Sequence, residues 1–260
     1  MIGDAPVDYA WPPVIALLVW WLGTGIVMLL DGLPRGTFRL SLPLSTLLAL
    51  GALVCIRHSA EDTTATGAYA GFICAVLVWG WHELAFLTGW ITGPRRQACS
   101  VPGHGPTRFR EAVQAILWHE LAIIAMTLLI VALTWSSANQ VAAWTFTLLW
   151  VMRLSAKLNL FLGVRNHGEE FLPPRLAYLG SYFRHRRMNA LLPLSLLAGI
   201  AVTALLIDAA LQTGSAGLRT GWLLLASLLS LALLEHLMMV LPLSPALLWR
   251  WALRTSPGSP

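Results

Sequence analysis

Charged residues are scarce in this sequence. Only 11% of its 260 residues are Asp, Glu, Lys or Arg, whereas 57% are hydrophobic, and the mean hydropathy is +0.69. This composition leaves too little polar surface to cover a water-soluble protein of this length. The sequence therefore excludes a soluble domain and predicts an all-α integral membrane protein, with a single transmembrane domain over residues 1–260.

Lysine and cysteine are also rare. The chain has one lysine against 16 arginines, and its net charge of +5 does not indicate nucleic-acid binding, because basic residues of membrane proteins collect on cytoplasmic loops. The three cysteines lie far apart, which excludes a disulfide-stapled module and a thiolate zinc cluster. No Lys or Arg precedes the first apolar run, so we expect it to remain as an anchor rather than to be cleaved as a signal peptide.

Long apolar runs are what the sequence has in place of charge. A helix needs about 20 apolar residues to cross a bilayer core of about 30 Å. Breakers such as Gly93-Pro94 and Pro173-Pro174 separate the runs. We therefore predict a bundle of about seven transmembrane helices, over Pro12–Leu30, Leu40–Ile56, Ala68–Ile91, Glu111–Trp135, Ala138–Leu162, Met188–Gln212 and Thr220–Leu241.

The arginines indicate how these spans are oriented. One set of alternate loops, together with the C-terminal segment, holds thirteen arginines, whereas the other set holds only Arg57 and Arg219. Positive side chains resist translocation, so the arginine-rich side faces the cytoplasm. We expect the N-terminus outside, the C-terminus in the cytoplasm, and two long cytoplasmic loops at about 92–110 and 163–187.

Eight of the ionisable residues inside the predicted spans fall at one level of the membrane. The third span carries Trp81-His82-Glu83-Leu84-Ala85, and the fourth repeats this pentapeptide at 118–122. Each such group costs about 2.5–3.5 kcal/mol on insertion scales, so several of them indicate a function or pairing. At 1.5 Å rise per residue they lie roughly 8–16 Å below the cytoplasmic boundary, which predicts one buried site that opens towards the cytoplasm. The eight are His82, Glu83, His119, Glu120, Arg153, Lys157, Glu235 and His236.

Three interpretations of this polar layer stay open. It can be a set of structural salt bridges that fixes helix packing. It can be a site for iron, manganese or zinc, although the Glu-x-x-His pattern of di-iron bundles, the histidine boxes of membrane desaturases and the His-Glu-x-x-His motif are all absent. It can also hold a tetrapyrrole, which needs one axial histidine and apolar or aromatic walls.

The second cytoplasmic loop contains a further polar group. Asn159, His167, Glu169 and Glu170 lie close to the predicted mouth of the buried site, where we expect them to gate or complete it. His167 and Glu170 are three residues apart, which on a helical turn lets both reach one ion or proton. The run Arg184-His185-Arg186-Arg187 is interpreted as an anchor for anionic lipid headgroups.

Four segments resemble a known family. They are Trp81-His82-Glu83-Leu84, Trp118-His119-Glu120-Leu121, residues 159–170 (NLFLGVRNHGEE) and residues 182–189 (YFRHRRMN). Here the chain is similar to the PuhE family of photosynthetic complex assembly proteins, over nearly its whole length. The resemblance implies an anoxygenic phototrophic bacterium, its intracytoplasmic photosynthetic inner membrane, and reaction-centre or light-harvesting subunits as partners.

Together these observations predict an assembly factor for the bacteriochlorophyll-containing photosystem. It would hold a pigment or a metal at His82, Glu83, His119, Glu120, Glu235 and His236, with Arg153 and Lys157 balancing charge. The alternative is an integral-membrane metal-dependent enzyme that modifies bacteriochlorophyll or carotenoid. A di-iron enzyme is one version of this alternative. A transporter is a third class, but the spans show no clear inverted repeat beyond the pentapeptide and no pair of broken helices.

Overall fold

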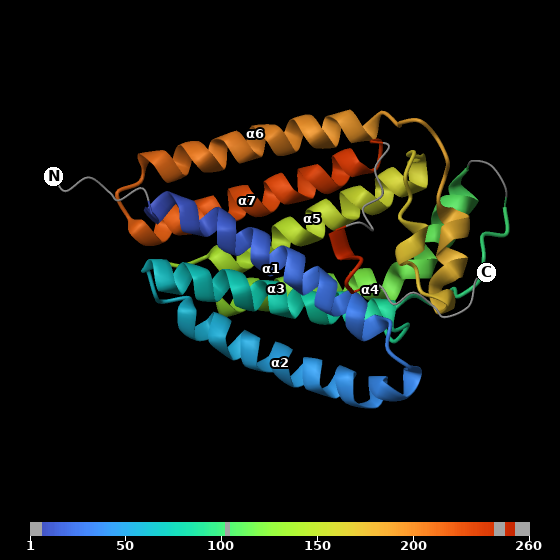
Figure 1. Cartoon of the computed structure of the whole chain (residues 1–260), viewed down its shortest axis with the longest axis horizontal. Coiled ribbons are helices and arrows are strands. Elements are labelled where there is room, and N and C mark those ends of the chain that lie inside the picture. The colour runs from blue at the N-terminus through green and yellow to red at the C-terminus, as the bar shows by residue number, and fades with distance from the viewer. Residues whose placement is uncertain (1–6, 102–104, 242–247, 253–260) are drawn as a thin grey trace.

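The computed structural model describes residues 7–101, 105–241 and 248–252, and side chains within these ranges except those of Val7, Asp8 and Glu170. In this part of the chain, seven long α-helices run side by side along one axis (Figure 1). They are α1 (Val7–Asp31), α2 (Phe38–Ser59), α3 (Ala65–Leu87), α4 (Pro106–Leu133), α5 (Val141–Leu162), α6 (Leu191–Gln212) and α7 (Ala216–Met238).

Local sequence explains several helix ends. The side chain of Thr64 accepts a hydrogen bond from the amide of Gly67 and caps α3, and Ser215 caps α7 in the same way. Pro106 begins α4, where its missing N–H costs nothing. Gly163 ends α5 with φ of +118°, a conformation that favours glycine. The seven predicted spans are thus confirmed as seven helices, with shifted ends.

Six of the seven helices are long and apolar enough to cross a membrane by length and composition. The remaining one, α5, has 22 residues and carries Arg153 and Lys157. It packs against α3, α4 and α7, and its cations lie within the bundle. We describe α5 as the seventh span because its two charges are paired with acids of neighbouring helices.

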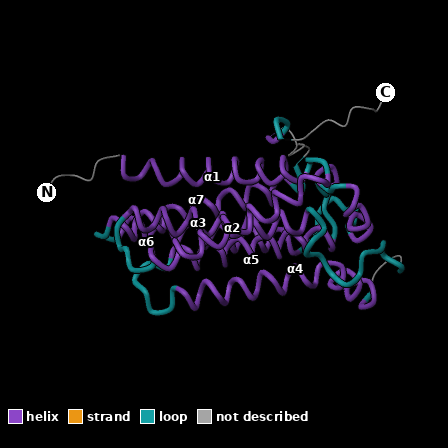
Figure 2. The backbone as a smooth tube through the Cα atoms, turned by 90° about the horizontal axis from the view of Figure 1, so that it is seen from below, coloured by secondary structure: helices purple, strands orange, loops and turns teal. Residues whose placement is uncertain are grey.

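The centre of the bundle is made by α3 and α7. Half of the apolar window of each is buried inside the protein (50%), against 11% for α1 and α6. Figure 2 shows α1 and α4 along opposite sides of the bundle, with the other helices between them. The outer helices present leucines to the surroundings, such as Leu47 on α2 (65% exposed) and Leu205 on α6 (68% exposed). These faces suit hydrocarbon as a solvent.

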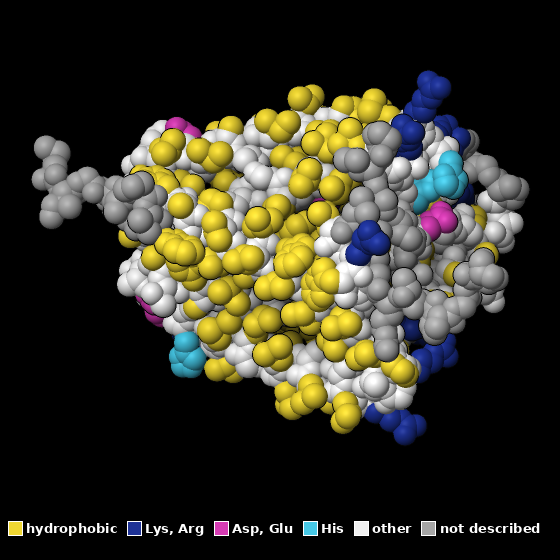
Figure 3. Space-filling model, in the orientation of Figure 1, with side chains coloured by type: hydrophobic (Ala, Val, Ile, Leu, Met, Phe, Trp, Pro, Cys, Tyr) yellow, Lys and Arg dark blue, Asp and Glu magenta, His cyan; other side chains and the backbone are white. Residues whose placement is uncertain are grey.

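Basic side chains gather at one end of the bundle, beyond an apolar band (Figure 3). The segment between α3 and α4 and the segment between α5 and α6 both lie at this end (Figure 1). The second of these contains the 3-10 helices η2 (Glu169–Phe171) and η3 (Pro174–Tyr182), and a short 3-10 turn, η1 (Arg35–Thr37), follows α1. The positive-inside rule predicts that this end faces the cytoplasm, and we refer to it by that prediction as the cytoplasmic end. The first loop lies earlier in the chain than expected, because α3 ends at Leu87 and α4 begins at Pro106.

Candidate functional site: a buried charged layer beside an apolar cavity

A cavity of about 400 Å³ lies between α1, α3, α5 and α7. Its walls are mostly apolar and aromatic, with Trp20, Trp79 and Phe86 among them. Residues of the α5–α6 segment, including His167 and Phe171, line the cavity at the cytoplasmic end. Four charged side chains interrupt the apolar wall: Glu83, Arg153, Lys157 and Glu235.

The two copies of the repeated pentapeptide pair with the same helix. Arg153 Nη2 of α5 lies 2.9 Å from Glu83 Oε2 of the first copy. Lys157 Nζ, one turn further along α5, lies 2.5 Å from Glu120 Oε1 of the second copy. Trp150 Nε1 donates a hydrogen bond of 3.3 Å to the other oxygen of Glu120. These contacts place the charged side chains of α3, α4 and α5 at one level along the bundle, which is what the residue count along each helix predicts.

Glu235 of α7 adds a third carboxylate near Arg153. Its Oε1 accepts a 2.8 Å hydrogen bond from Trp20 Nε1 of α1, across 215 residues of sequence. The layer therefore holds three acids and two cations, and Arg153 interacts electrostatically with all three acids. One carboxylate has no cation of its own, so the layer as a whole carries a net charge of −1 when all five groups are ionised. Glu120 does not line the cavity, so the two acids and two cations of the cavity wall balance each other.

The histidines of the two pentapeptides occupy equivalent environments. His82 and His119 are each 1% exposed, and among the described residues neither ring nitrogen of either has a hydrogen-bond partner. The ring of His119 packs on Phe86, with centroids 4.5 Å apart, and His82 packs on Phe146 at 5.8 Å. Buried polar groups without partners are rare, which makes this pair of imidazoles unusual for packing residues.

His236 and Asn159 are hydrogen-bonded, in contrast. His236 Nε2 lies 2.9 Å from Ser155 Oγ, and its Nδ1 lies 2.8 Å from the carbonyl oxygen of Ala232. Asn159 is fully buried at the end of α5, where its amide donates to the carbonyl of Ser155. Neither residue lines the cavity.

The six predicted ligands do not come within reach of one metal ion. In the described part of the chain, no three of them bring ligand atoms within 4.8 Å of one another. Glu83 and Glu235 line the cavity, whereas the three histidines lie outside its lining. Metal ligation by this layer therefore gains no support from the geometry, and its role towards a pigment stays a prediction.

The cytoplasmic segments form a fixed cover over this end of the bundle. Arg175 of η3 pairs with Asp31 at the end of α1 and donates a 2.7 Å hydrogen bond to the carbonyl of Leu87 at the end of α3. Arg108 donates 2.6 Å to the carbonyl oxygen of Tyr182. Arg95 Nε donates a 2.9 Å hydrogen bond to the hydroxyl of Tyr182, and this bond raises the pKa of Arg95.

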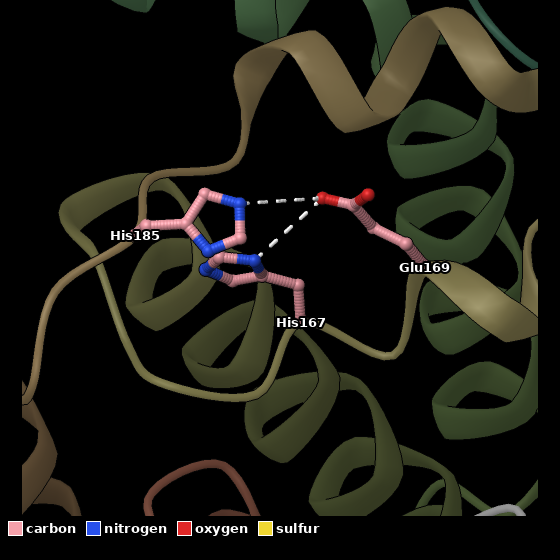
Figure 4. A group of neighbouring side chains, drawn as sticks. All are labelled: His167, Glu169 and His185. Atoms are coloured by element: carbon pink, nitrogen blue, oxygen red, sulfur yellow. Dashed lines mark ion pairs between the residues drawn. The ribbon is translucent and has the colours of Figure 1, made fainter.

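The structure brings His167 and Glu169 together, whereas the spacing predicted Glu170 as the partner of His167, and a third residue joins them. His185, interpreted as part of a headgroup anchor, lies with its ring centroid 3.9 Å from that of His167 (Figure 4). A parallel β-bridge between Val164 and His185 causes this contact. No local pattern signals it, because 18 residues separate the two histidines. The side chain of Glu170 lies outside the described residues.

The fold and the site define a multi-pass, all-α membrane protein with a buried ion-pair layer beside an apolar cavity. The chain belongs to the family described as "Protein of unknown function (DUF3623)", whose family model matches residues 7–259. It is 40% identical over 241 residues to the "Uncharacterized 30.4 kDa protein in puhA 5'region" of Rhodobacter capsulatus, covering 91% of this chain and 88% of that protein. No solved structure matches the chain.

Proposed function

We propose that this protein is an assembly factor for the bacteriochlorophyll-containing photosynthetic complex, and that it holds a tetrapyrrole pigment in the cavity between α1, α3, α5 and α7. The observation that carries the proposal is the cavity itself. It offers apolar and aromatic walls at membrane depth together with one charged wall, which suits a large apolar ligand that has a polar centre or a carboxyl group.

The family context supports a photosynthetic role. The relative from Rhodobacter capsulatus is named for its position in the 5' region of puhA. The resemblance of the sequence to assembly proteins of the PuhE type points in the same direction. We infer that the protein works in the photosynthetic inner membrane of a bacterium, beside reaction-centre or light-harvesting subunits.

The charged wall would orient the ligand. Glu235 is held by Trp20, and Glu83 is held by Arg153, so both carboxylates are fixed before a ligand enters. A carboxylate is a suitable oxygen ligand for a magnesium-type centre. Arg153 also lies on the cavity wall, 41% of its side chain is accessible, and a guanidinium binds a propionate or carboxyl group well.

The histidines would act from behind the wall. The ring of His119 packs against Phe86, and Phe86 itself lines the cavity. A shift of this one aromatic ring would bring the unpartnered imidazole towards the ligand. We propose that His82 and His119 become axial ligands of the pigment only after such a shift of the neighbouring side chains. His236 is instead held in place by its contacts with Ser155 and Ala232.

The test is to produce the full chain in a phototrophic strain that lacks its own copy, purify it in mild detergent, and record the absorption spectrum of extracted pigment. Gly80 lines the cavity, and a Cβ there would lie 3.7 Å from Val27, so Gly80→Leu directs a larger side chain into the space. Gly51 of α2 has open space around it, so Gly51→Leu is the matched control. We expect bacteriochlorophyll or a precursor with wild type and Gly51→Leu, and loss of at least about tenfold with Gly80→Leu.

A second pair of variants separates charge from packing. Glu235→Gln keeps an oxygen for the hydrogen bond from Trp20 but removes the negative charge, whereas Glu235→Ala removes both. We expect both variants to lose pigment and to lower the yield of photosystem. If purified wild type carries no pigment, and all of these variants assemble photosystem at the wild-type level, the proposal is wrong. Stoichiometric iron in the buried layer with substrate turnover would instead favour the metal-dependent enzyme.

A further inference from the structure

Three potential ligands converge outside the membrane, at the mouth of the cavity. His167 Nδ1 lies 3.6 Å from Glu169 Oε1, and His185 Nε2 lies 4.0 Å from the same oxygen. Figure 4 shows both imidazoles directed at this carboxylate. In the described part of the chain, this is the only group of three or more His, Cys, Asp or Glu whose ligand atoms all lie within 4.8 Å of one another.

The hydrogen bonds of His167 fix which of its nitrogens can bind a cation. Its Nε2 lies 3.1 Å from the carbonyl oxygen of Val164 and 2.8 Å from that of Arg184. A carbonyl only accepts, so Nε2 must carry the proton and donate it. In the neutral ring Nδ1 then has a free lone pair, and this lone pair faces the carboxylate of Glu169.

Two electron-rich groups that face each other at this distance repel unless a positive charge lies between them. A metal ion bound by both groups supplies such a charge. The Nε2–H to carbonyl arrangement is the one that holds ligating histidines in other metal sites, because it fixes the tautomer and the ring orientation. His167 has a side chain only 3% exposed, so its orientation is set by the fold.

We propose that His167, Glu169 and His185 bind one divalent transition-metal ion of the Zn²⁺ class. Two imidazoles and one carboxylate are the donor set of three-ligand zinc sites, which keep a fourth position for water or another ligand. The same donors suit nickel or copper, whereas magnesium prefers oxygen ligands. This metal site is independent of the proposed pigment site. A negative result for one of them does not contradict the other.

The ligands can reach metal-binding distances with small movements. Zinc–nitrogen bonds of about 2.0–2.1 Å in a tetrahedral site place neighbouring ligand atoms about 3.3 Å apart. The buried His167 would stay in place. The side chains of Glu169 and His185 are 50% and 79% exposed, so both can rotate towards it.

A metal here would fasten two parts of the cytoplasmic cover to each other. His167 and Phe171 line the mouth of the cavity, and the segment around His185 is already held to Val164 by backbone hydrogen bonds of 3.0 and 3.1 Å. A bound ion would connect these segments through side chains as well. We therefore infer that metal occupancy stabilises the loop that covers the cavity mouth.

The test uses the full chain in detergent, freed of any polyhistidine tag, stripped with a chelator and titrated with ZnCl₂ by calorimetry, with metal analysis after gel filtration. His185→Ala and Glu169→Gln remove exposed ligands. His58→Ala, an exposed histidine at the opposite end of the bundle, is the matched control. We expect one zinc per chain in wild type and His58→Ala, a dissociation constant weakened at least about tenfold in the other two variants, and no binding of MgCl₂.

Limited trypsin digestion provides a second measurement, because the covering loop contains several arginines. Zinc should slow cleavage within residues 163–187 of the wild type but not of His185→Ala. If wild type retains no zinc, or if all three variants bind it equally, the proposal is wrong and the three residues do not form a metal site.

Discussion

Lys157 of α5 lies 2.5 Å from Glu120 of α4, and Arg153, one turn earlier on the same helix, pairs with Glu83 of α3. One helix thus supplies a cation to each copy of the repeated pentapeptide. The two glutamates occupy the same position in the two pentapeptides, and each forms an ion pair with a cation of α5. This relationship explains how a span with two cations is accommodated in the bundle: each charge meets an opposite charge away from lipid.

Removing the acid from this pair should destabilise the protein strongly. Glu120→Gln leaves Lys157 with 17% of its side chain exposed and no acid in direct contact. Loss of one partner of a buried ion pair costs about 3–5 kcal/mol. We expect a clear drop in the thermal unfolding temperature in detergent.

The matched control is Glu61→Gln. Glu61 forms an exposed pair with Arg57, where the side chains are 64% and 53% exposed. Such a pair contributes below about 1 kcal/mol, so the unfolding temperature should barely change. Equal effects of the two substitutions would contradict the assignment of Lys157–Glu120 as a buried pair.

His119→Leu should separate function from stability. Neither ring nitrogen of His119 has a partner among the described residues, so an apolar side chain of similar size removes two unsatisfied polar atoms. We expect the free energy of unfolding to stay within about 1 kcal/mol of wild type or to rise. The yield of photosystem should nevertheless fall.

Both readouts are needed for this variant: unfolding in detergent, and absorption of membranes from complemented cells. A variant that is stable and fully active would show that this imidazole only fills space. Phe86→Leu, which alters the neighbouring ring without touching the histidine, shows whether packing at this point matters by itself.

The orientation of the bundle can be tested with two glycines that have open space around them. Gly36 follows α1 at the arginine-rich end, and Gly214 lies between α6 and α7 at the other end. In a background with Cys99→Ser, we expect a membrane-impermeant maleimide to label Gly214→Cys in intact spheroplasts and Gly36→Cys only in inverted vesicles. The reverse pattern would overturn the positive-inside assignment for this protein.

The helices were predictable from the sequence because the cost of exposing backbone in hydrocarbon leaves few alternatives. The predicted span Ala138–Leu162 corresponds to Val141–Leu162, and Met188–Gln212 corresponds to Leu191–Gln212. The larger shifts are at α1 and α4, each of which begins five residues earlier than predicted, at Val7 and Pro106. Proline disrupts the interior of a helix, but in the first turn, where Pro106 lies, it is favourable.

The candidate site was predictable only in part. Depth along each helix follows from residue counting, so the common level of Glu83, Glu120 and Arg153 could be expected. Which of these side chains contact each other depends on the orientation of each helix about its own axis, and helix packing determines that orientation. The hydrogen bond between Trp20 and Glu235 joins the first helix to the last and has no local sequence signal. The same holds for His185, which a backbone bridge in an irregular loop places beside His167.

The sequence by itself determined that this chain crosses a membrane, how many long apolar helices it forms, and which ionisable residues enter the bilayer, because these depend on composition and on the rise per residue of a helix. Tertiary structure alone decided that two glutamates and not the histidines face the cavity beside Arg153, and that three residues of the cytoplasmic loop meet at its mouth. Such contacts join residues far apart in the chain, and only the packing of whole helices and the path of a covering loop fix them.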